Sequence, residues 1–129
     1  DGLFVPTGLT GMGPLLITEG PSDCAAALDL GYDAIGRPSC LGAVWYTVEL
    51  IRQRWPVNVV IVGDADGPGR DGAEKLARDI VGISKTLKVI YPPDGIKDLR
   101  AWKNAGATVD HVQIAIDETE TRQISWGNN

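Results

Sequence analysis

The fold is decided by the stretch Val59-Val60-Ile61-Val62-Gly63-Asp64-Ala65-Asp66-Gly67-Pro68-Gly69. Its four leading residues are apolar β-formers, and they run directly into two aspartates and a Gly-Pro-Gly segment. A short, wholly apolar run bounded by turn residues is typical of a strand buried on both faces of a parallel sheet. Ligands in such sheets gather at the carboxyl ends of the strands. The stretch therefore predicts a central strand over residues 57–63, with Asp64 and Asp66 placed where a divalent cation could be held.

The composition is that of a single globular domain. The chain has 129 residues, of which 43% are hydrophobic and 22% charged, values usual for one soluble domain. No apolar stretch approaches the roughly 20 residues that span a bilayer. The N-terminus lacks the basic start and apolar core of a signal peptide. We therefore expect a cytoplasmic protein with no membrane partner, cut from a longer chain.

Charge and cysteine content narrow the function classes. The formal net charge of −5 counts against strong binding of nucleic acid by this domain alone, because nucleic-acid-binding domains are usually basic. Carboxylates committed to metal ions would neutralise part of that charge locally. Neither Cys24 nor Cys40 belongs to a Cys-x-x-Cys pair, so a structural zinc site is not expected. We interpret both cysteines as reduced and buried, with a disulfide as the open alternative.

The rest of the chain alternates predicted strands and helices. Strands are expected at residues 15–18, 32–35, 57–63 and 86–91, and helices at 24–30, 43–55, 71–81, 96–103 and 108–119. Pro21-Ser22-Asp23 is a helix opening, Gly31 is a helix stop signal, and residues 36–42 are expected to form a loop. Strands alternating with helices predict a parallel sheet with right-handed crossovers.

This order predicts an α/β domain with a central four-stranded, mainly parallel sheet flanked by helices. We place the domain at residues 14–119. Residues 1–13 form an extended lead-in, which could include a short strand at residues 3–5, and residues 120–129 form a C-terminal tail that frays at its end.

Acidic residues follow two of the predicted strands. Glu19 ends the first strand and Asp64 the central one. If the chain winds outward from the first strand and then back to its other side, these strands are neighbours at a switch point. Glu19, Asp64 and Asp66 would then share a crevice, where like charges need a cation to remain ionised. Oxygen ligands without Cys or His suit Mg²⁺ or Mn²⁺.

Such a site supports phosphoryl chemistry, because bound metal ions polarise phosphoryl oxygens and stabilise the attacking and leaving groups. A further carboxylate could transfer a proton, and Lys97 and Arg70 could contact phosphate oxygens.

Each acidic residue also has a purely structural interpretation. An Asp-x-Asp after a strand is often a turn former or a helix cap. We interpret Asp71 as the cap of its helix and Asp23 as the cap of the first helix. Asp98 could simply cap a short helix, and Lys97 could simply be solvated. Three tryptophans are expected in the core instead of on a base-stacking surface, namely Trp45, Trp55 and Trp102.

Two motifs together resemble the Toprim domain of bacterial-type primases, type IA and II topoisomerases, OLD-family nucleases and recombination proteins. The first is the apolar strand ending in Glu-Gly, Leu15-Leu16-Ile17-Thr18-Glu19-Gly20, and the second is the strand ending in Asp-x-Asp, Val59 to Asp66. The chain is most similar to primases and to phage or plasmid primase–helicases. Three details carry that similarity: the continuation from Asp64 to Ala73 (with Ala73 one place late), the pair Lys97-Asp98, and the phage-type Pro38-Ser39 loop.

The resemblance covers about residues 14–105. It implies the metal-dependent nucleotidyltransferase core of a DNA primase-like protein, which makes RNA primers from nucleoside triphosphates on single-stranded DNA. By this resemblance Asp64 and Asp66 would bind Mg²⁺ or Mn²⁺, Glu19 would bind metal or act as acid and base, and Lys97 and Asp98 would lie at the rim of the crevice.

A primase also needs a zinc module, and a primase–helicase needs a P-loop. This sequence contains neither motif, so we expect a zinc-binding or helicase domain elsewhere in a longer parent protein. Two alternatives stay open: Toprim-type phosphodiester cleavage by a nuclease or topoisomerase, and a non-catalytic module that binds nucleic acid or a partner protein.

Overall fold

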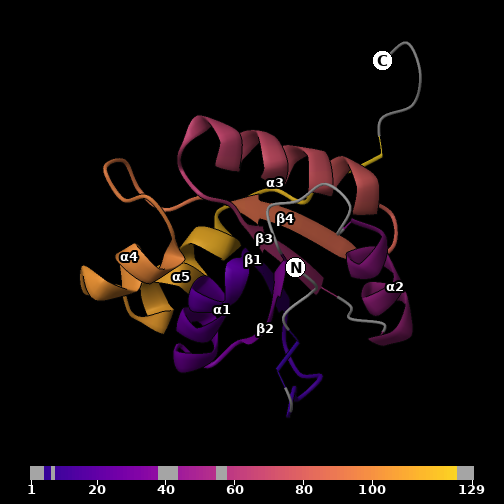
Figure 1. Ribbon diagram of the computed structural model, residues 1–129, viewed down its shortest axis with the longest axis horizontal. Helices are drawn as coiled ribbons and strands as arrows, with labels where there is room; N and C mark the ends of the chain where they lie inside the picture. Colours follow the sequence, from indigo (N-terminus) through magenta and orange to yellow (C-terminus); the bar gives the residue numbers. More distant parts are fainter. Residues whose placement is uncertain (1–4, 7, 38–43, 55–57, 125–129) are drawn as a thin grey trace.

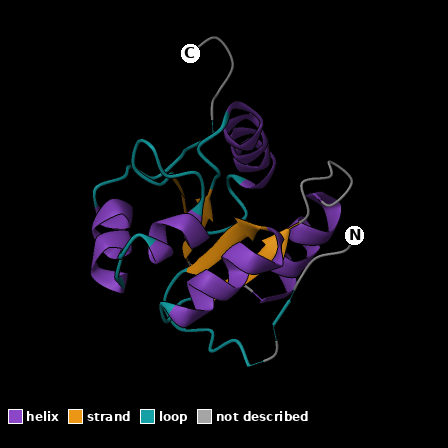
Figure 2. Cartoon of the chain, turned by 60° about the vertical axis from the view of Figure 1, so that its left-hand side comes forward, coloured by secondary structure: helices purple, strands orange, loops and turns teal. Residues whose placement is uncertain are grey.

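The computed structural model describes residues 5–6, 8–37, 44–54 and 58–124, with only the backbone for residues 44–46 and 54. The elements in chain order are β1 (Leu15–Glu19), α1 (Gly20–Asp29), β2 (Asp33–Arg37), α2 (Val44–Arg54), β3 (Asn58–Val62), α3 (Gly67–Ile80), β4 (Thr86–Ile90), α4 (Leu99–Asn104) and α5 (Val109–Asp117). The strands form one four-stranded sheet, which helices flank on both sides (Figures 1 and 2).

The sheet is parallel throughout, with strand order β2-β1-β3-β4. Leu16 of β1 lies between Ala34 of β2 and Val60 of β3. The chain therefore steps outward from β1 to β2 and then crosses back to β3. This confirms the predicted α/β fold and puts the switch point between β1 and β3, so the ends of these two strands lie side by side.

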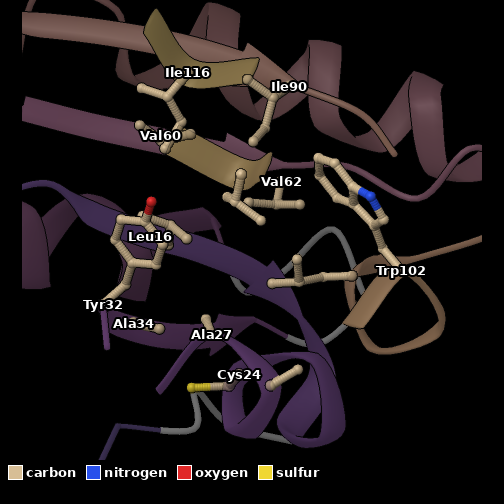
Figure 3. Packing of buried hydrophobic residues seen from close by; sticks show 13 residues of the cluster. Leu16, Cys24, Ala27, Tyr32, Ala34, Val60, Val62, Ile90, Trp102 and Ile116 are labelled. Carbon is tan, nitrogen blue, oxygen red and sulfur yellow. The ribbon is translucent and has the colours of Figure 1, made fainter. Parts of the chain in front are cut away.

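Both faces of the sheet are buried, which explains why its strands are apolar along their whole length. On one face Leu16 and Val60 pack with side chains of α1, α4 and α5; Figure 3 shows Trp102 of α4 on this side, close to Val62. On the other face Ile17 packs with side chains of α2 and α3. Burying a large aliphatic side chain stabilises the fold by about 1.5–3 kcal/mol, so both helical layers contribute to holding the strand ends in place.

Two helices begin earlier than predicted. α1 starts at Gly20 instead of residue 24, and α3 starts at Gly67 instead of residue 71. In each helix a proline, Pro21 or Pro68, lies within the first two helical positions. Proline is tolerated there because the first backbone N–H groups of a helix have no partner inside it. The Gly-Pro-Gly segment is thus the first turn of α3 and does not break the structure before it.

The cap assignments change with these boundaries. Asp66 caps α3, and its carboxylate accepts a hydrogen bond from the backbone N–H of Gly69 at 2.6 Å. Asp71 lies inside the helix, beyond its first turn, so the interpretation of Asp71 as the cap was wrong. The cap position of α1 is Glu19, and Asp23 lies in the first helical turn. The interpretation of Asp23 as a cap was therefore also wrong.

Strand β2 is longer than predicted and includes Gly36 and Arg37, which were expected in the loop 36–42. A Cβ atom on Gly36 would lie 2.5 Å from the carbonyl oxygen of Gly20. Glycine is needed here because the strand passes directly against the start of α1, so it marks a close approach instead of a turn. The remainder of the expected loop lies outside the described residues.

Several smaller predictions are confirmed. Trp102 and Cys24 are buried, and Cys24 is a free thiol. Gly31 follows α1 with a φ of 101°, as expected for a glycine after a helix.

Other predictions are not confirmed or cannot be compared. Val5, the described part of the short strand considered at residues 3–5, is not in a strand. The predictions for Leu3, Phe4, Cys40, Trp55, the side chain of Trp45 and residues 126–129 fall outside what the structure describes.

The segments that flank the sheet are attached to its edge strands. In the lead-in, the backbone N–H groups of Thr10 and Gly11 donate to the Asp33 carboxylate of β2 at 2.9 and 2.8 Å. After α5, the N–H of Arg122 donates to the carbonyl of Leu87 in β4 at 2.6 Å.

Within the described residues, no helix has the length and apolar character needed to cross a membrane.

Candidate metal centre

Three aspartates from different parts of the chain meet at the carboxyl end of the sheet. Asp23 of α1, Asp64 after β3 and Asp98 before α4 each offer a carboxylate oxygen, and these oxygens lie within 4.8 Å of one another. Asp23 is only 3% exposed, and the other two are partly buried. We call these three residues the aspartate cluster.

Two of its members are held by the first turn of α4. Asp98 caps this helix and accepts a hydrogen bond from the N–H of Ala101 at 2.8 Å. Asp23 accepts one from the N–H of Arg100 at 3.1 Å. α4 begins at Leu99, not at residue 96 as predicted, because Asp98 has the extended backbone of a cap residue. The structural interpretation of Asp98 as a cap is therefore confirmed.

Asp64 is the member whose charge is least compensated. The pKa of Asp64 is raised to about 7, first by burial and then by the charges of Glu19, Asp23, Asp98 and Asp66 in that order. Its Oδ1 atom is buried and has no hydrogen-bond partner among the described residues. A buried carboxylate oxygen without a donor is costly, and a bound cation would remove that cost.

Burial also raises the pKa of Asp23, and the charge of Asp98 raises it as well, whereas hydrogen bonds from the backbone N–H of Arg100 and from the Asp64 carboxyl lower it. The cluster therefore holds two carboxyl groups whose ionisation is disfavoured in the absence of a cation. Hard divalent cations such as Mg²⁺ and Mn²⁺ prefer carboxylate oxygens. The orphaned oxygen of Asp64 and the all-oxygen donor set fit such an ion.

Glu19 and Asp66 flank the cluster. Both lie close enough to Asp64 for their charges to raise its pKa, but the carboxylate oxygens within 4.8 Å of one another are those of Asp23, Asp64 and Asp98. Of the three acids predicted from the sequence, only Asp64 belongs to the cluster, and the roles of Glu19 and Asp66 stay predictions. Asp66 Oδ1 is engaged in capping α3. A Cβ atom on Gly69 would lie 2.5 Å from Asp64 Cβ and 2.7 Å from Asp66 Oδ1, so only glycine lets α3 start this close to both aspartates.

Lys97 and Arg70 border the loop that carries Asp64 and Asp66. The carbonyl of Lys97 accepts a hydrogen bond from the N–H of Ala65 at 2.7 Å, and its side chain is exposed. Arg70 donates from Nε to the carbonyl of Ala65 at 3.1 Å, and its guanidinium lies 4.2 Å from the centroid of the Tyr91 ring. Both side chains are exposed beside this loop, and their contact with phosphate oxygens stays a prediction.

The sequence reasoning missed two residues of this region. Asp23 was set aside as a helix cap, although Pro21 in the first turn could have signalled that α1 starts earlier. Arg37 was placed in a loop. It ends β2 beside Glu19 in the register of the sheet, and its residue surface is 8% exposed. Burial lowers the pKa of Arg37, while the charges of Glu19 and Asp64 raise it.

Comparison with known proteins identifies the fold. No family model and no curated protein matches the sequence. One similar structure is a DNA primase domain from Pseudomonas aeruginosa, with a TM-score of 0.70 and 15% sequence identity. The superposition covers 86% of this chain and 35% of the primase chain. Another is the DnaG primase catalytic domain bound to single-stranded DNA, with a TM-score of 0.66 and 19% sequence identity, where the superposition covers 84% of this chain and 34% of the primase chain.

A third similar structure is a small TOPRIM domain protein from Bacillus stearothermophilus, with a TM-score of 0.52 and 18% sequence identity. The superposition covers 89% of this chain and 97% of that protein. The chain thus has the Toprim fold, an α/β domain with an all-parallel sheet. More particularly, its structural neighbours include the catalytic cores of DNA primases, of whose length it spans about a third.

Proposed function

We propose that this chain is the metal-dependent nucleotidyltransferase core of a DNA primase-like protein, which makes RNA primers on single-stranded DNA. The observation that carries the proposal is the aspartate cluster at the carboxyl ends of neighbouring strands, with a buried oxygen of Asp64 that lacks a partner. The likeness in fold to primase cores supports the choice of reaction.

In this proposal Asp64 holds Mg²⁺ or Mn²⁺ together with other acids of the region, Asp23 and Asp98 from the cluster and Glu19 and Asp66 beside it. When bound, the ion polarises phosphoryl oxygens and stabilises the attacking and leaving oxygens of nucleotidyl transfer. Glu19, Asp64 and Asp66 are the proposed catalytic residues, with Glu19 also available to move a proton.

The proposed partners are nucleoside triphosphates and single-stranded DNA. Exposed Lys97 and Arg70 would contact phosphate at the rim of the site. Because the net charge is −5 and the chain spans about a third of the primase cores, we propose that a zinc-binding or helicase domain of a longer, cytoplasmic parent protein grips the template. Residues 14–119 would be the catalytic unit, with the lead-in 1–13 and the tail 120–129 as flanking segments.

The test has two steps. First, the melting temperature of the chain is measured with increasing Mg²⁺ or Mn²⁺, for the wild type, Asp64→Asn and the control Asp79→Asn, which changes an exposed acid of α3. We expect the ions to raise the melting temperature of the wild type and the control, because an ion bound to the folded state stabilises it. We expect no such rise in Asp64→Asn.

Second, the same proteins and Glu19→Gln are incubated with the ion, labelled nucleotides and single-stranded DNA, with and without the parent protein. We expect primers from the wild type and the control, and a loss of about 100-fold or more in Asp64→Asn and Glu19→Gln, since each acid acts on the reacting phosphate. If the full-length DNA strand is degraded and no primer is made, the result would favour the alternative function, phosphodiester cleavage. Absence of both activities and of ion binding would leave a non-catalytic module.

A further inference from the structure

Arg37 is a buried cation beside the acids of the candidate centre. It ends β2, in register with Glu19 at the end of β1. Its side chain extends toward α3, because a Cβ atom on Gly72 would lie 3.3 Å from Arg37 Nη2. Charges on Glu19 and Asp64 act on its guanidinium. The guanidinium thus lies between the carboxyl ends of the strands and the first half of α3.

This guanidinium has no ion-pair partner in the part of the chain that the structure describes. The ion pairs there join Lys103 to Asp29 and Arg122 to Glu74, and none of the hydrogen bonds among the described residues uses the Arg37 side chain. An arginine that is 8% exposed normally has its charge and its five N–H donors matched. The nearby acids provide only longer-range attraction, so the donors remain available to an anion.

We propose that Arg37 is the phosphate anchor of this site: it binds a phosphate group that is also bound by the cation of the aspartate cluster. The inference rests on the proposed function, because it needs that cation. A planar guanidinium matches two phosphate oxygens at once. The phosphate comes from a nucleoside triphosphate or from a nucleic-acid backbone, which share this chemistry.

The competing interpretation is that Arg37 only offsets the repulsion between Glu19 and Asp64. Both interpretations expect Arg37→Met to bind Mg²⁺ at least as tightly as the wild type, because a positive charge leaves the vicinity of the carboxylates. They differ for phosphate ligands, which only the anchor interpretation expects to bind more weakly. They also differ for Arg37→Lys, which keeps the charge and loses the two-pronged geometry.

The experiment measures dissociation constants by calorimetry for the wild type, Arg37→Met, Arg37→Lys and the control Arg52→Met, which changes an exposed arginine of α2. Each is titrated with Mg²⁺ alone, with ATP at saturating Mg²⁺, and with a single-stranded DNA oligonucleotide at saturating Mg²⁺. For a phosphate ligand, Arg37→Met should weaken binding about tenfold or more and Arg37→Lys about threefold or more, as expected for a charged two-pronged hydrogen bond. Mg²⁺ affinity should not fall, and Arg52→Met should match the wild type.

A loss confined to ATP assigns the phosphate to the triphosphate, and a loss confined to the oligonucleotide assigns it to the backbone. Unchanged affinity for both ligands in Arg37→Met, or full recovery in Arg37→Lys, overturns the inference while the metal site stands. If Arg37→Met does not fold, Arg37→Lys decides alone. Failure of the wild type to bind Mg²⁺ overturns the proposed function and this inference together, which separates the two outcomes.

Discussion

Asp64 is the residue at which folding and function conflict. Its carboxyl is placed among four other acids, and one of its oxygens is buried without a donor. A structural acid in that position would be expected to have a hydrogen-bond donor or a cationic partner within contact distance. The absence of one among the described residues is the reason to treat Asp64 as a ligand and not as a turn former.

The first prediction concerns the pH dependence of stability without divalent ions. The pKa of Asp64 is raised from 3.8 to about 7 in the folded chain, so the folded state binds more protons than the unfolded state between these values. The free energy of unfolding therefore falls as pH rises through that window. Asp64→Asn should remove this contribution and make the metal-free chain more stable at pH 8, by on the order of 2 kcal/mol, which is about half of the full value of the shift because the Asp64 carboxyl is only partly buried.

Urea unfolding at pH 5 and pH 8 in the presence of a chelator measures the effect. Asp79→Asn is the control, since it removes one negative charge from the exposed surface of α3. The same pH dependence in Asp64→Asn and in the wild type would show that the pKa of Asp64 is not raised in the folded chain.

At the scale of elements, the start of α3 determines the geometry of the acidic loop. Gly67 and Gly69 both lie in its first turn, but only at Gly69 would a Cβ atom collide with Asp64 and Asp66. A Cβ atom on Gly67 meets nothing within 4 Å. The pair offers a test in which the same substitution is made two residues apart.

The second prediction is that Gly69→Ala lowers the free energy of unfolding by about 1–3 kcal/mol, because the loop and helix must move apart. It should also weaken Mg²⁺ binding. Gly67→Ala should be neutral or slightly stabilising, since alanine favours helix more than glycine does. Chemical denaturation and the Mg²⁺-dependent rise in melting temperature report both effects. Equal behaviour of the two variants would mean that the close approach at Gly69 is unimportant.

The strand ends of the site could be predicted from the sequence, whereas the long-range contacts of two residues near them could not. An apolar run followed by an acid, together with the rule for parallel sheets, was enough to bring Glu19 and Asp64 together. Asp23 is fixed by the N–H of Arg100, 77 residues away, and no local pattern reports such a contact. Arg37 lies beside Glu19 because of the register of β1 with β2. The sequence did not indicate this, because the preceding Gly36 is a residue type more usual in loops than in strands.

At the scale of the whole molecule, the segment after α5 closes the β4 side of the sheet. Arg122 donates from its backbone to Leu87, and its guanidinium binds both oxygens of Glu74 at 2.6 and 2.9 Å. The Tyr91 hydroxyl donates to Glu74 Oε2 at 2.8 Å. Composition alone did not predict this attachment, because its partners lie on α3 and β4.

The third prediction follows from the Glu74 carboxylate. The pKa of Glu74 is lowered from 4.5 to about 2, most of all by the hydrogen bonds from Arg122 and in smaller part by the Tyr91 hydroxyl, so the stability gained from these contacts is complete above pH 4.5 and is lost as pH falls through 2. Arg122→Ala should cost about 0.5–1 kcal/mol at pH 7, a small value because both side chains are partly exposed. Urea unfolding at pH 7 and pH 3 should show the difference from the wild type shrinking, with Arg52→Ala as the control. A cost of the same size at both pH values would contradict this origin.

The peptide at Ala65 has a consequence for the thermodynamics of ion binding. Its N–H is held by Lys97 and its carbonyl by Arg70, so the backbone between the two aspartates is already fixed on both sides. Little conformational entropy is then spent when an ion arrives. We expect the Ala65 amide to exchange slowly with deuterium even in chelator, and Arg70→Met to accelerate that exchange. Protection that develops only on addition of Mg²⁺ would instead mean that the ion itself organises the loop.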